Sequence, residues 1–492
     1  MTETVQRSAA HAEVTQALFG CQQAFETLVV RGIEAAGSDD VARIASIGEE
    51  LSRAGARYVA GELESLVRHI RDGDRNAPRV LLRAQTTLRV FERVLSLDVG
   101  AAALAADAEQ GPEQRAVVDA APALDDKRAL VPVLEELART VERLIASGLT
   151  TASKATKQKL DASFKEASRL KLLRVATSLR YVGDELQRFL DDSEHFSARR
   201  LTFFAHRTWL LARGLLEAIA ENNQAQLARL LLATAPRPVK RLRLAVLGVQ
   251  KRALLDGSAA FEFRMTVLDD KGDPAKGTRL LWSCVFGAKK NVPAEAFLHL
   301  PQPQKFVPTL LLEQTEIIVT DAAVTTDQHG YGRLVLGPKS TVTAGKKLSA
   351  WSDLLAWDPA RFGRRLQAHR ITPLDIEVEL QEELVLTGWE LQPAQDHPFR
   401  SELRVFPIAW NGLVLDAVCS TGPDGEQLFA RLAALAKPRA ERPALYGVMH
   451  VEMGRLVVQP LTLFGDDGPE HLMMSGENID LAALMKTMDF RS

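Results

Sequence analysis

The chain has 492 residues, of which 46% are hydrophobic and 25% are charged, and its formal net charge is −2. This length exceeds what a single hydrophobic core supports, so we expect roughly three or four domains. The near-neutral charge excludes a whole-protein electrostatic field that would attract nucleic acid or an anionic membrane.

Membrane and metal signals are missing from the sequence. No stretch reaches the ~18 consecutive apolar residues of a membrane-spanning helix, and the N-terminus does not resemble a signal peptide. Cys21, Cys284 and Cys419 lie far apart, which fits neither a zinc site nor a disulfide framework. We therefore predict a cytoplasmic protein without membrane association, in which each cysteine is a buried apolar side chain.

Residues 14–97 have the apolar periodicity of amphipathic helices. The first helical face consists of Phe25, Leu28, Val29 and Ile33. Gly55 and residues 73–74 mark breaks between later helices, and Pro78 suits the first turn of the last one. These signals predict a helical bundle over residues 1–98.

A change of composition follows this segment. Residues 99–127 are rich in Ala, Gly, Pro, Asp, Glu and Gln and show little apolar periodicity. We interpret them as a mobile linker, because they can bury too little apolar area to offset their ordering entropy. Helical periodicity returns afterwards and predicts a second bundle over residues 128–235.

The two predicted bundles share a pattern of apolar positions. Residues 28–33 align with residues 144–149, an offset of 116. The same offset carries Val59 onto Val175 and Leu63 onto Leu179. We interpret the pattern as a duplication of a helical unit. Two copies fall short of the three that a stacked repeat array needs.

Beyond Pro236 the periodicity changes from helical to alternating. Residues 261–267 alternate as a half-buried strand does, and residues 280–286 form a second strand after a turn-forming cluster. Further short strands follow, one of them at residues 376–380, and helices are expected near residues 352–368, 425–436 and 479–488. The prediction is an α+β multidomain chain with antiparallel β-rich domains at 236–350 and 351–492.

No catalytic or cofactor motif stands out. The chain has no nucleophile elbow, phosphate-binding loop or dinucleotide fingerprint, and its ten histidines show no metal-ligand spacing. Asp269, Asp270 and Asp273 begin like a calcium loop, but Pro274 stands where that loop needs glycine. We therefore predict no catalytic residue, no cofactor and no metal site.

The second helical segment and the junction after it are strongly basic. Residues 154–252 contain 20 Lys and Arg against 9 Asp and Glu, a net charge of +11, whereas residues 1–72 contain 7 against 11, a net of −4. This contrast predicts a surface for an anionic partner, either an acidic protein face or nucleic acid. A solvated face, or one neutralised by the acidic first copy, is the competing interpretation. The candidate partner-binding residues are Lys154, Lys157, Lys165, Arg169, Lys171, Arg174, Lys240, Arg241 and Arg243.

The repeat has a recognisable motif. It begins with Leu28, Gly32 and Ile33 and continues with Val59, Leu63 and related positions. It resembles helical segments of bacterial proteins that carry or accompany SWIM-type zinc fingers, in systems with MoxR-type ATPases and von Willebrand A proteins. The resemblance covers residues 25–97 and 141–220. A SWIM finger requires a Cys-x-Cys pair, which this chain lacks, so zinc binding is not implied. The resemblance implies a non-enzymatic member of a chaperone-like assembly system.

Three hypotheses for function follow. The first is an intracellular scaffold or adaptor that binds protein partners through its helical bundles. The second is a nucleic-acid-binding protein that combines the basic second copy with the groove of an OB-type β barrel. The third is an enzyme whose pocket is assembled from side chains on different strands, the candidates being Trp282, Cys284, Trp389, Trp410 and His450.

Overall fold

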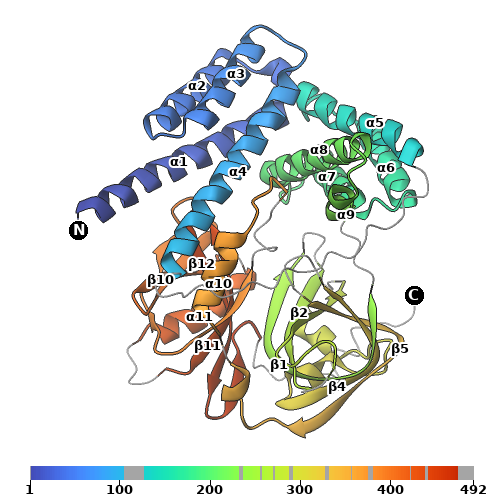
Figure 1. Cartoon of the computed structure of the whole chain (residues 1–492), viewed down its shortest axis with the longest axis vertical. Helices are drawn as coiled ribbons and strands as arrows, with labels where there is room; N and C mark the ends of the chain where they lie inside the picture. Colours follow the sequence, from blue (N-terminus) through green and yellow to red (C-terminus); the bar gives the residue numbers. More distant parts are fainter. Residues whose placement is uncertain are drawn as a thin grey trace. The chain divides into compact units, whose positions relative to one another are not determined.

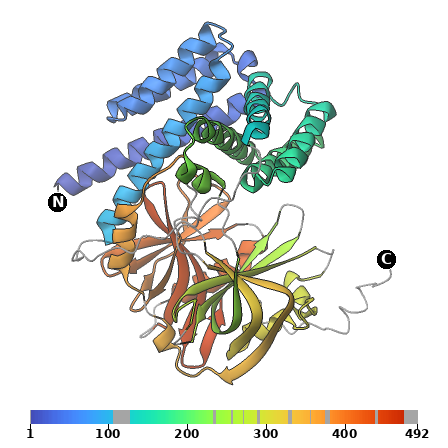
Figure 2. The same cartoon turned by 45° about the vertical axis from the view of Figure 1, so that its right-hand side comes forward.

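The computed structural model describes the chain at residues 2–104, 127–231, 236–254, 258–269, 272–287, 292–326, 332–355, 357–374, 381–421, 423–437 and 442–474. These residues fall into two compact units, one built from helices and one built mainly from strands (Figures 1 and 2). The helical unit contains residues 2–99, 127–231 and 367–374. The β-rich unit contains the remaining described residues. The predicted α+β multidomain class is confirmed.

The helices of the first unit follow one another with short connections. Their bounds are α1 Thr2–Arg31, η1 Ile33–Ala35, α2 Ser38–Arg53, α3 Arg57–Arg71, α4 Ala77–Leu104, α5 Lys127–Ser147, α6 Lys154–Arg169, α7 Leu173–Leu190, α8 Ala198–Ala220 and α9 Gln224–Leu231. The predicted breaks are confirmed, since Gly55 and Gly73 adopt φ of 90° and 61° in the turns after α2 and α3. These left-handed values suit glycine, which has no Cβ to clash.

The helical segments share one hydrophobic core. It runs from Val14 on α1 to Leu231 on α9, and every helix contributes buried residues to it. The apolar positions paired by the 116-residue offset are buried on both sides of the comparison: Val59 and Leu63 on α3, and Val175 and Leu179 on α7. The two bundles predicted from the sequence therefore belong to one compact helical unit.

A backbone-to-backbone contact joins the two halves of this unit. Gly32 and Gly148 end α1 and α5 with φ of 94° and 72°, and each lies directly against the other. A Cβ on Gly148 would lie 2.3 Å from the backbone nitrogen of Gly32, a separation that atoms cannot adopt. The N–H of Leu149 donates a hydrogen bond of 2.8 Å to the carbonyl of Val30.

Polar contacts join α4 to the helices of the second half. Glu142 on α5 accepts two hydrogen bonds from Arg79 on α4, at 3.0 and 2.9 Å, and one from the indole N–H of Trp209 on α8 at 2.9 Å. His206 on α8 lies 2.9 Å from the hydroxyl of Thr86 on α4. Burial holds the pKa of His206 well below its usual value, so this contact is made by the neutral ring.

The second unit consists of strands with a few short helices. Its strands are β1 Arg237–Ala253, β2 Ala259–Val267, β3 Arg279–Phe286, β4 Thr315–Thr326, β5 Gly332–Lys347, β6 Glu382–Leu386, β7 Glu390–Leu391, β8 Gln395–Asp396, β9 Leu403–Trp410, β10 Leu413–Ser420, β11 Ala444–Glu452, β12 Arg455–Gly465 and β13 Gly468–His471. Its helices are η2 Ala294–His299, η3 Pro308–Leu312, η4 Ser352–Leu354, α10 Pro359–Ala368 and α11 Pro423–Leu435.

The first strands close into a barrel in the order β1-β2-β3-β5-β4. All neighbouring pairs are antiparallel except β3 and β5, which run parallel where Leu280 meets Gly332. Alternation places Phe261, Phe263 and Met265 of β2 in the barrel core, as the sequence pattern predicts. The strands predicted at residues 261–267 and 280–286 are present as β2 and β3, which pair antiparallel.

The later strands form a second, mixed sheet in the order β6-β11-β12-β10-β9-β7. Helix α11 packs on β10, and the rings of Phe406 and Phe429 lie 5.3 Å apart. The barrel packs against this sheet through β1, whose Gly248 leaves room for the ring of Tyr446 on β11. A bulge between Val246 and Gly248 accompanies this contact.

Some expectations need correction, and others concern residues outside the described ranges. The predicted linker, residues 99–127, is helical at both ends, because α4 continues to Leu104 and α5 begins at Lys127. Residues 105–126 of that linker lie outside the described residues, as do the strand expected at 376–380 and the helix expected at 479–488. The expected helices near 352–368 and 425–436 are present as η4, α10 and α11. None of the described helices has the length and apolar character of a membrane span.

The Gly32–Gly148 contact yields a stability prediction. Gly148→Ala introduces a Cβ at a left-handed position against backbone, and we expect it to lower the free energy of unfolding by roughly 2–4 kcal/mol. The matched control is Gly61→Ala, an exposed position on α3 with no atom within 4 Å of the added Cβ. The control should be neutral or stabilising by up to about 1 kcal/mol. Denaturant unfolding followed by helical circular dichroism measures both, and equal stabilities would contradict the close approach.

Candidate functional site: two helical hairpins

The nine candidate basic residues divide between the two units. Six lie on α6, on the turn after it and on α7, and the other three lie on β1 of the barrel. The first group is Lys154, Lys157, Lys165, Arg169, Lys171 and Arg174, and the second is Lys240, Arg241 and Arg243. The candidates therefore belong to two surfaces, each of which is considered by itself.

On the helical surface only some of the charges are available to a partner. Lys154, Lys165 and Lys171 are exposed, and within the described part of the chain none of the three lies within ion-pair distance of a carboxylate. Lys157 is paired with Asp161 one turn along α6.

The other two members of the helical group are also engaged. Arg169 forms a bidentate pair with Glu166 at 2.9 and 2.6 Å. Arg174 donates a hydrogen bond of 3.2 Å to the carbonyl of Arg229. The available positive charge is thus smaller than the count from the sequence.

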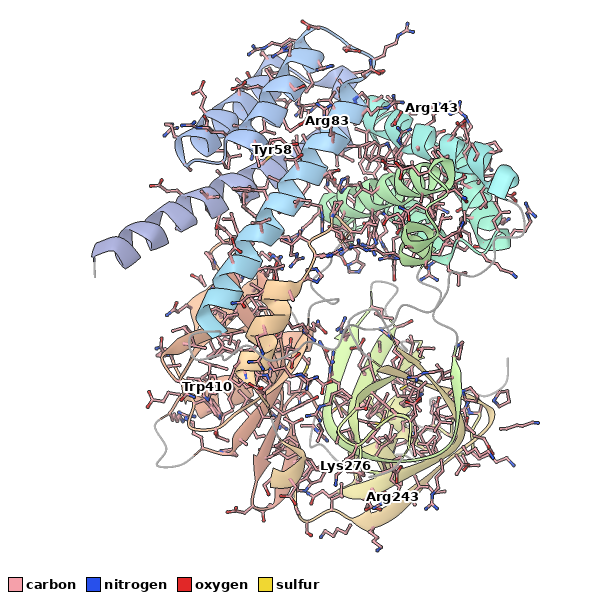
Figure 3. All side chains as sticks on the ribbon, in the orientation of Figure 1. Tyr58, Arg83, Arg143, Arg243, Lys276 and Trp410 are labelled. Carbon is pink, nitrogen blue, oxygen red and sulfur yellow. The ribbon has the colours of Figure 1, made fainter. Side chains whose placement is uncertain are left out.

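On the barrel surface, as on the helical surface, part of the candidate charge is engaged in an ion pair. Lys240 and Arg241 are exposed on β1, whereas Arg243 is paired with Glu316 of β4 at 2.5 Å (Figure 3 labels Arg243). The Arg243 guanidinium holds the pKa of the Glu316 carboxyl below its usual value. Arg243 therefore joins β1 to β4 and does not act as a free cation.

An exposed leucine lies on the same hairpin as the available lysines. Leu173 begins α7 and is 66% exposed, although it immediately follows the buried Leu172. Lys171, which precedes both, has a φ of 59° in the tight turn between α6 and α7. Leu173 therefore offers apolar surface that a binding partner could bury. Sequence reasoning missed Leu173, because its spacing suits the core face as well as the surface.

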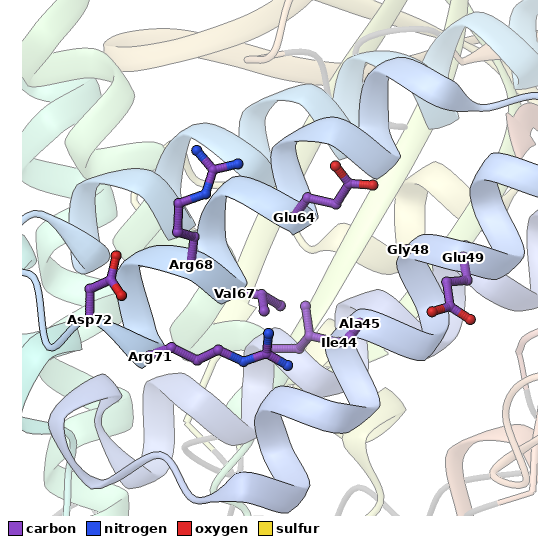
Figure 4. Close-up of a pocket in the computed structure, with 9 residues that line it drawn as sticks. All are labelled: Ile44, Ala45, Gly48, Glu49, Glu64, Val67, Arg68, Arg71 and Asp72. Carbon is purple, nitrogen blue, oxygen red and sulfur yellow. The ribbon is translucent and has the colours of Figure 1, made fainter.

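A groove lies on the other hairpin, between α2 and α3 (Figure 4). Its volume is about 310 Å³, and its floor is made by Ile44 and Val67. Ala45 and Gly48 on α2 carry too little side chain to fill it. The charged residues that line it are Glu49, Glu64, Arg68, Arg71 and Asp72. Sequence reasoning missed this groove too, since small residues on a helix also occur at close contacts.

The two hairpins correspond position by position. Helices α2 and α6 begin 116 residues apart, at Ser38 and Lys154, and α3 and α7 do so at Arg57 and Leu173. At this offset Gly48 corresponds to Phe164, whose side chain packs partly buried on the helical core. The groove of the α2–α3 hairpin thus lies where the α6–α7 hairpin carries an aromatic ring.

Charges at the corresponding exposed positions also differ. Glu49 corresponds to Lys165, and Glu64 corresponds to Arg180, all four being exposed. The frame of the hairpins is shared, and at these two pairs of exposed positions the charges are opposite in sign. This is the pattern expected when buried positions maintain a fold and exposed positions differ in what they bind.

The residues suggested as an assembled enzyme pocket do not come together. Trp282 and Cys284 are buried in the barrel core, and burial raises the pKa of the Cys284 thiol to about 12, which disfavours a nucleophilic thiolate. Trp389, Trp410 and His450 belong to the second sheet and its loops. The indole N–H groups of Trp389 and Trp410 donate to the carbonyls of Pro443 and Thr387, each at 3.0 Å (Figure 3 labels Trp410).

Among the described residues, no group of three or more His, Cys, Asp and Glu side chains is placed to hold a metal ion. No protein-family profile matches the sequence, and no curated protein matches it either.

The outer face of β2 is covered by the second sheet. Arg264 is 2% exposed and donates a 3.4 Å hydrogen bond to Glu383 of β6, which also lies 3.3 Å from Arg279 of β3. On β6 beside it, burial raises the pKa of Glu382. A buried ion network therefore occupies the place where an OB-type barrel would bind a strand of nucleic acid.

This network yields a second stability prediction. Glu383→Gln removes the carboxylate between two arginines, and we expect a loss of about 3 kcal/mol in the free energy of unfolding of the β-rich unit. The control, Glu390→Gln, changes an exposed glutamate on β7 and should alter stability by less than about 0.5 kcal/mol. Thermal unfolding followed by tryptophan fluorescence compares the two variants, and a neutral Glu383→Gln would contradict a structural role for the network.

Proposed function

We propose that the protein is a non-enzymatic scaffold or adaptor whose helical unit binds partner proteins through its two outer hairpins, α2–α3 and α6–α7. The observation that carries the proposal is the α6–α7 surface, on which Leu173, Lys165 and Lys171 are all exposed and the two lysines have no acidic partner in the described residues. The partner of this surface is an acidic protein face with an apolar recess.

The architecture supports such a role. Both hairpins rest on the shared core through residues such as Leu63 and Leu179, so their outer faces are held on rigid elements. Rigid presentation lowers the entropy lost on binding and favours affinity. The resemblance of the repeat to proteins of MoxR-type ATPase and von Willebrand A systems suggests a chaperone-like assembly as the setting, and we extend the proposal to that setting.

Affinity purification from the native host tests the scaffold proposal. We expect the tagged protein to recover partner proteins at low salt, and Lys165→Glu/Lys171→Glu to reduce their recovery at least tenfold, because the reversal repels an acidic face. The control variant, Lys339→Glu/Lys347→Glu, makes the same change of net charge on exposed β5 positions and should recover partners as well as the unmodified protein. Recovery of the unmodified protein with no other chain would contradict the proposal.

A second candidate, nucleic-acid binding, is favoured by one observation. The closed five-stranded barrel β1-β2-β3-β5-β4 has the strand number of OB-type barrels, many of which bind oligonucleotides. With Arg264 covered, binding would have to use the exposed Lys240 and Arg241 on β1 or the basic α6–α7 surface.

A gel-shift series against salt tests this alternative. Specific binding predicts a dissociation constant well below about 10⁻⁴ M at physiological salt, with a loss of affinity in Lys240→Glu/Arg241→Glu. Binding no tighter than about 10⁻⁴ M, and equal in the variant, is ordinary non-specific attraction and would remove this candidate.

A further inference from the structure

The groove between α2 and α3 has a directional pattern of charge. Glu49 and Glu64 lie toward one end of it, and Arg68, Arg71 and Asp72 lie toward the other (Figure 4). None of these side chains is paired with another described residue. The acidic end is the one beside Gly48, where the missing side chain leaves the recess.

The α6–α7 surface presents the complementary features. Leu173 projects with 66% of its surface exposed, and Lys165 and Lys171 are exposed on the same hairpin. A leucine side chain suits an apolar recess floored by Ile44 and Val67. The lysines suit the two glutamates at its acidic end.

We propose that the helical unit self-associates head to tail, with Leu173 of one molecule seated in the α2–α3 groove of a second copy. Lys165 and Lys171 then face Glu49 and Glu64 across the interface. This rests on the proposed function in one respect: it identifies the acidic face bound by the α6–α7 hairpin as this chain's own groove.

A single molecule does not satisfy its own groove. The α2–α3 and α6–α7 hairpins lie on different sides of the helical unit (Figure 1). The surfaces in contact are different, so the interface is heterologous. A pair of molecules therefore retains a free groove on one molecule and a free Leu173 on the other. Such an interface propagates into a ring or an open filament.

Two variants separate the halves of this interface. Gly48→Phe fills the groove with the side chain that the α6–α7 hairpin has at the corresponding position, Phe164. Leu173→Ser removes the leucine side chain that would enter the groove. A Cβ on Gly48 would make only ordinary contacts, the nearest being Leu63 at 3.6 Å. Gly48→Phe retains Leu173, and Leu173→Ser retains the groove.

Sedimentation velocity of the purified full chain over a concentration series is the test. The unmodified protein should form oligomers that grow with concentration up to about 100 µM, a range typical of moderate interfaces. Each variant alone should remain monomeric, with its dissociation constant raised at least tenfold, and an equimolar mixture of the two should give a 1:1 dimer that grows no further. A monomeric unmodified protein at every concentration, or a mixture that stays monomeric, overturns the proposal.

Charge exchange provides a second measurement that does not depend on filling the groove. Glu49→Lys/Glu64→Lys and Lys165→Glu/Lys171→Glu should each abolish association, while their mixture should restore oligomers in which the two variants alternate, because every groove then meets a hairpin of opposite charge. Oligomers that persist unchanged in either variant overturn the proposed contact. Self-association without any recovered partner protein would contradict the scaffold function and leave this inference standing, so the two failures are distinguishable.

Discussion

The helical unit depends on one close contact, the approach of the backbones at Gly32 and Gly148. Both residues end a helix in the left-handed region, and neither has room for a Cβ. The contact fixes α1 against α5 and adds a hydrogen bond between Leu149 and Val30. Because the two helix ends meet here, the hairpins that follow them, α2–α3 and α6–α7, leave in different directions while sharing one core.

The consequence is a separation of tasks between buried and exposed positions. Leu63 and Leu179 occupy corresponding places in the same core. On the outside, a glycine on α2 leaves a groove where Phe164 packs on α6, and glutamates face solvent where Lys165 and Arg180 do. Buried apolar area maintains the frame, and we propose that the exposed charges and Leu173 provide the chemistry of recognition.

Much of the fold follows from sequence periodicity. The helices, the glycine breaks at 55 and 73 and the strands β2 and β3 were predicted, because apolar spacing and turn residues are local signals. Pairings between distant residues carry no such signal. The bond from Arg79 to Glu142 and the parallel β3–β5 pair join positions whose proximity is set by packing alone.

The candidate site was predictable in part. Counting charge singled out α6 and α7, but it credited Lys157 and Arg169 as available cations, whereas both have carboxylate partners on the same helix. It could not distinguish the exposed Leu173 from its buried neighbour Leu172, since that difference depends on the geometry of a single turn. The groove exists because Gly48 has no side chain, and a single sequence gives no direct signal for such a groove.

The central claim is that recognition takes place on the outer faces of the two hairpins. Crosslinking of the protein in its native complexes, followed by mass-spectrometric mapping, tests it most directly. The account predicts intermolecular crosslinks concentrated on lysines of the α6–α7 hairpin and on carboxylates that line the α2–α3 groove, including Lys165 and Glu64. Intermolecular crosslinks that are confined to the barrel and the second sheet, with none on either hairpin, would contradict it.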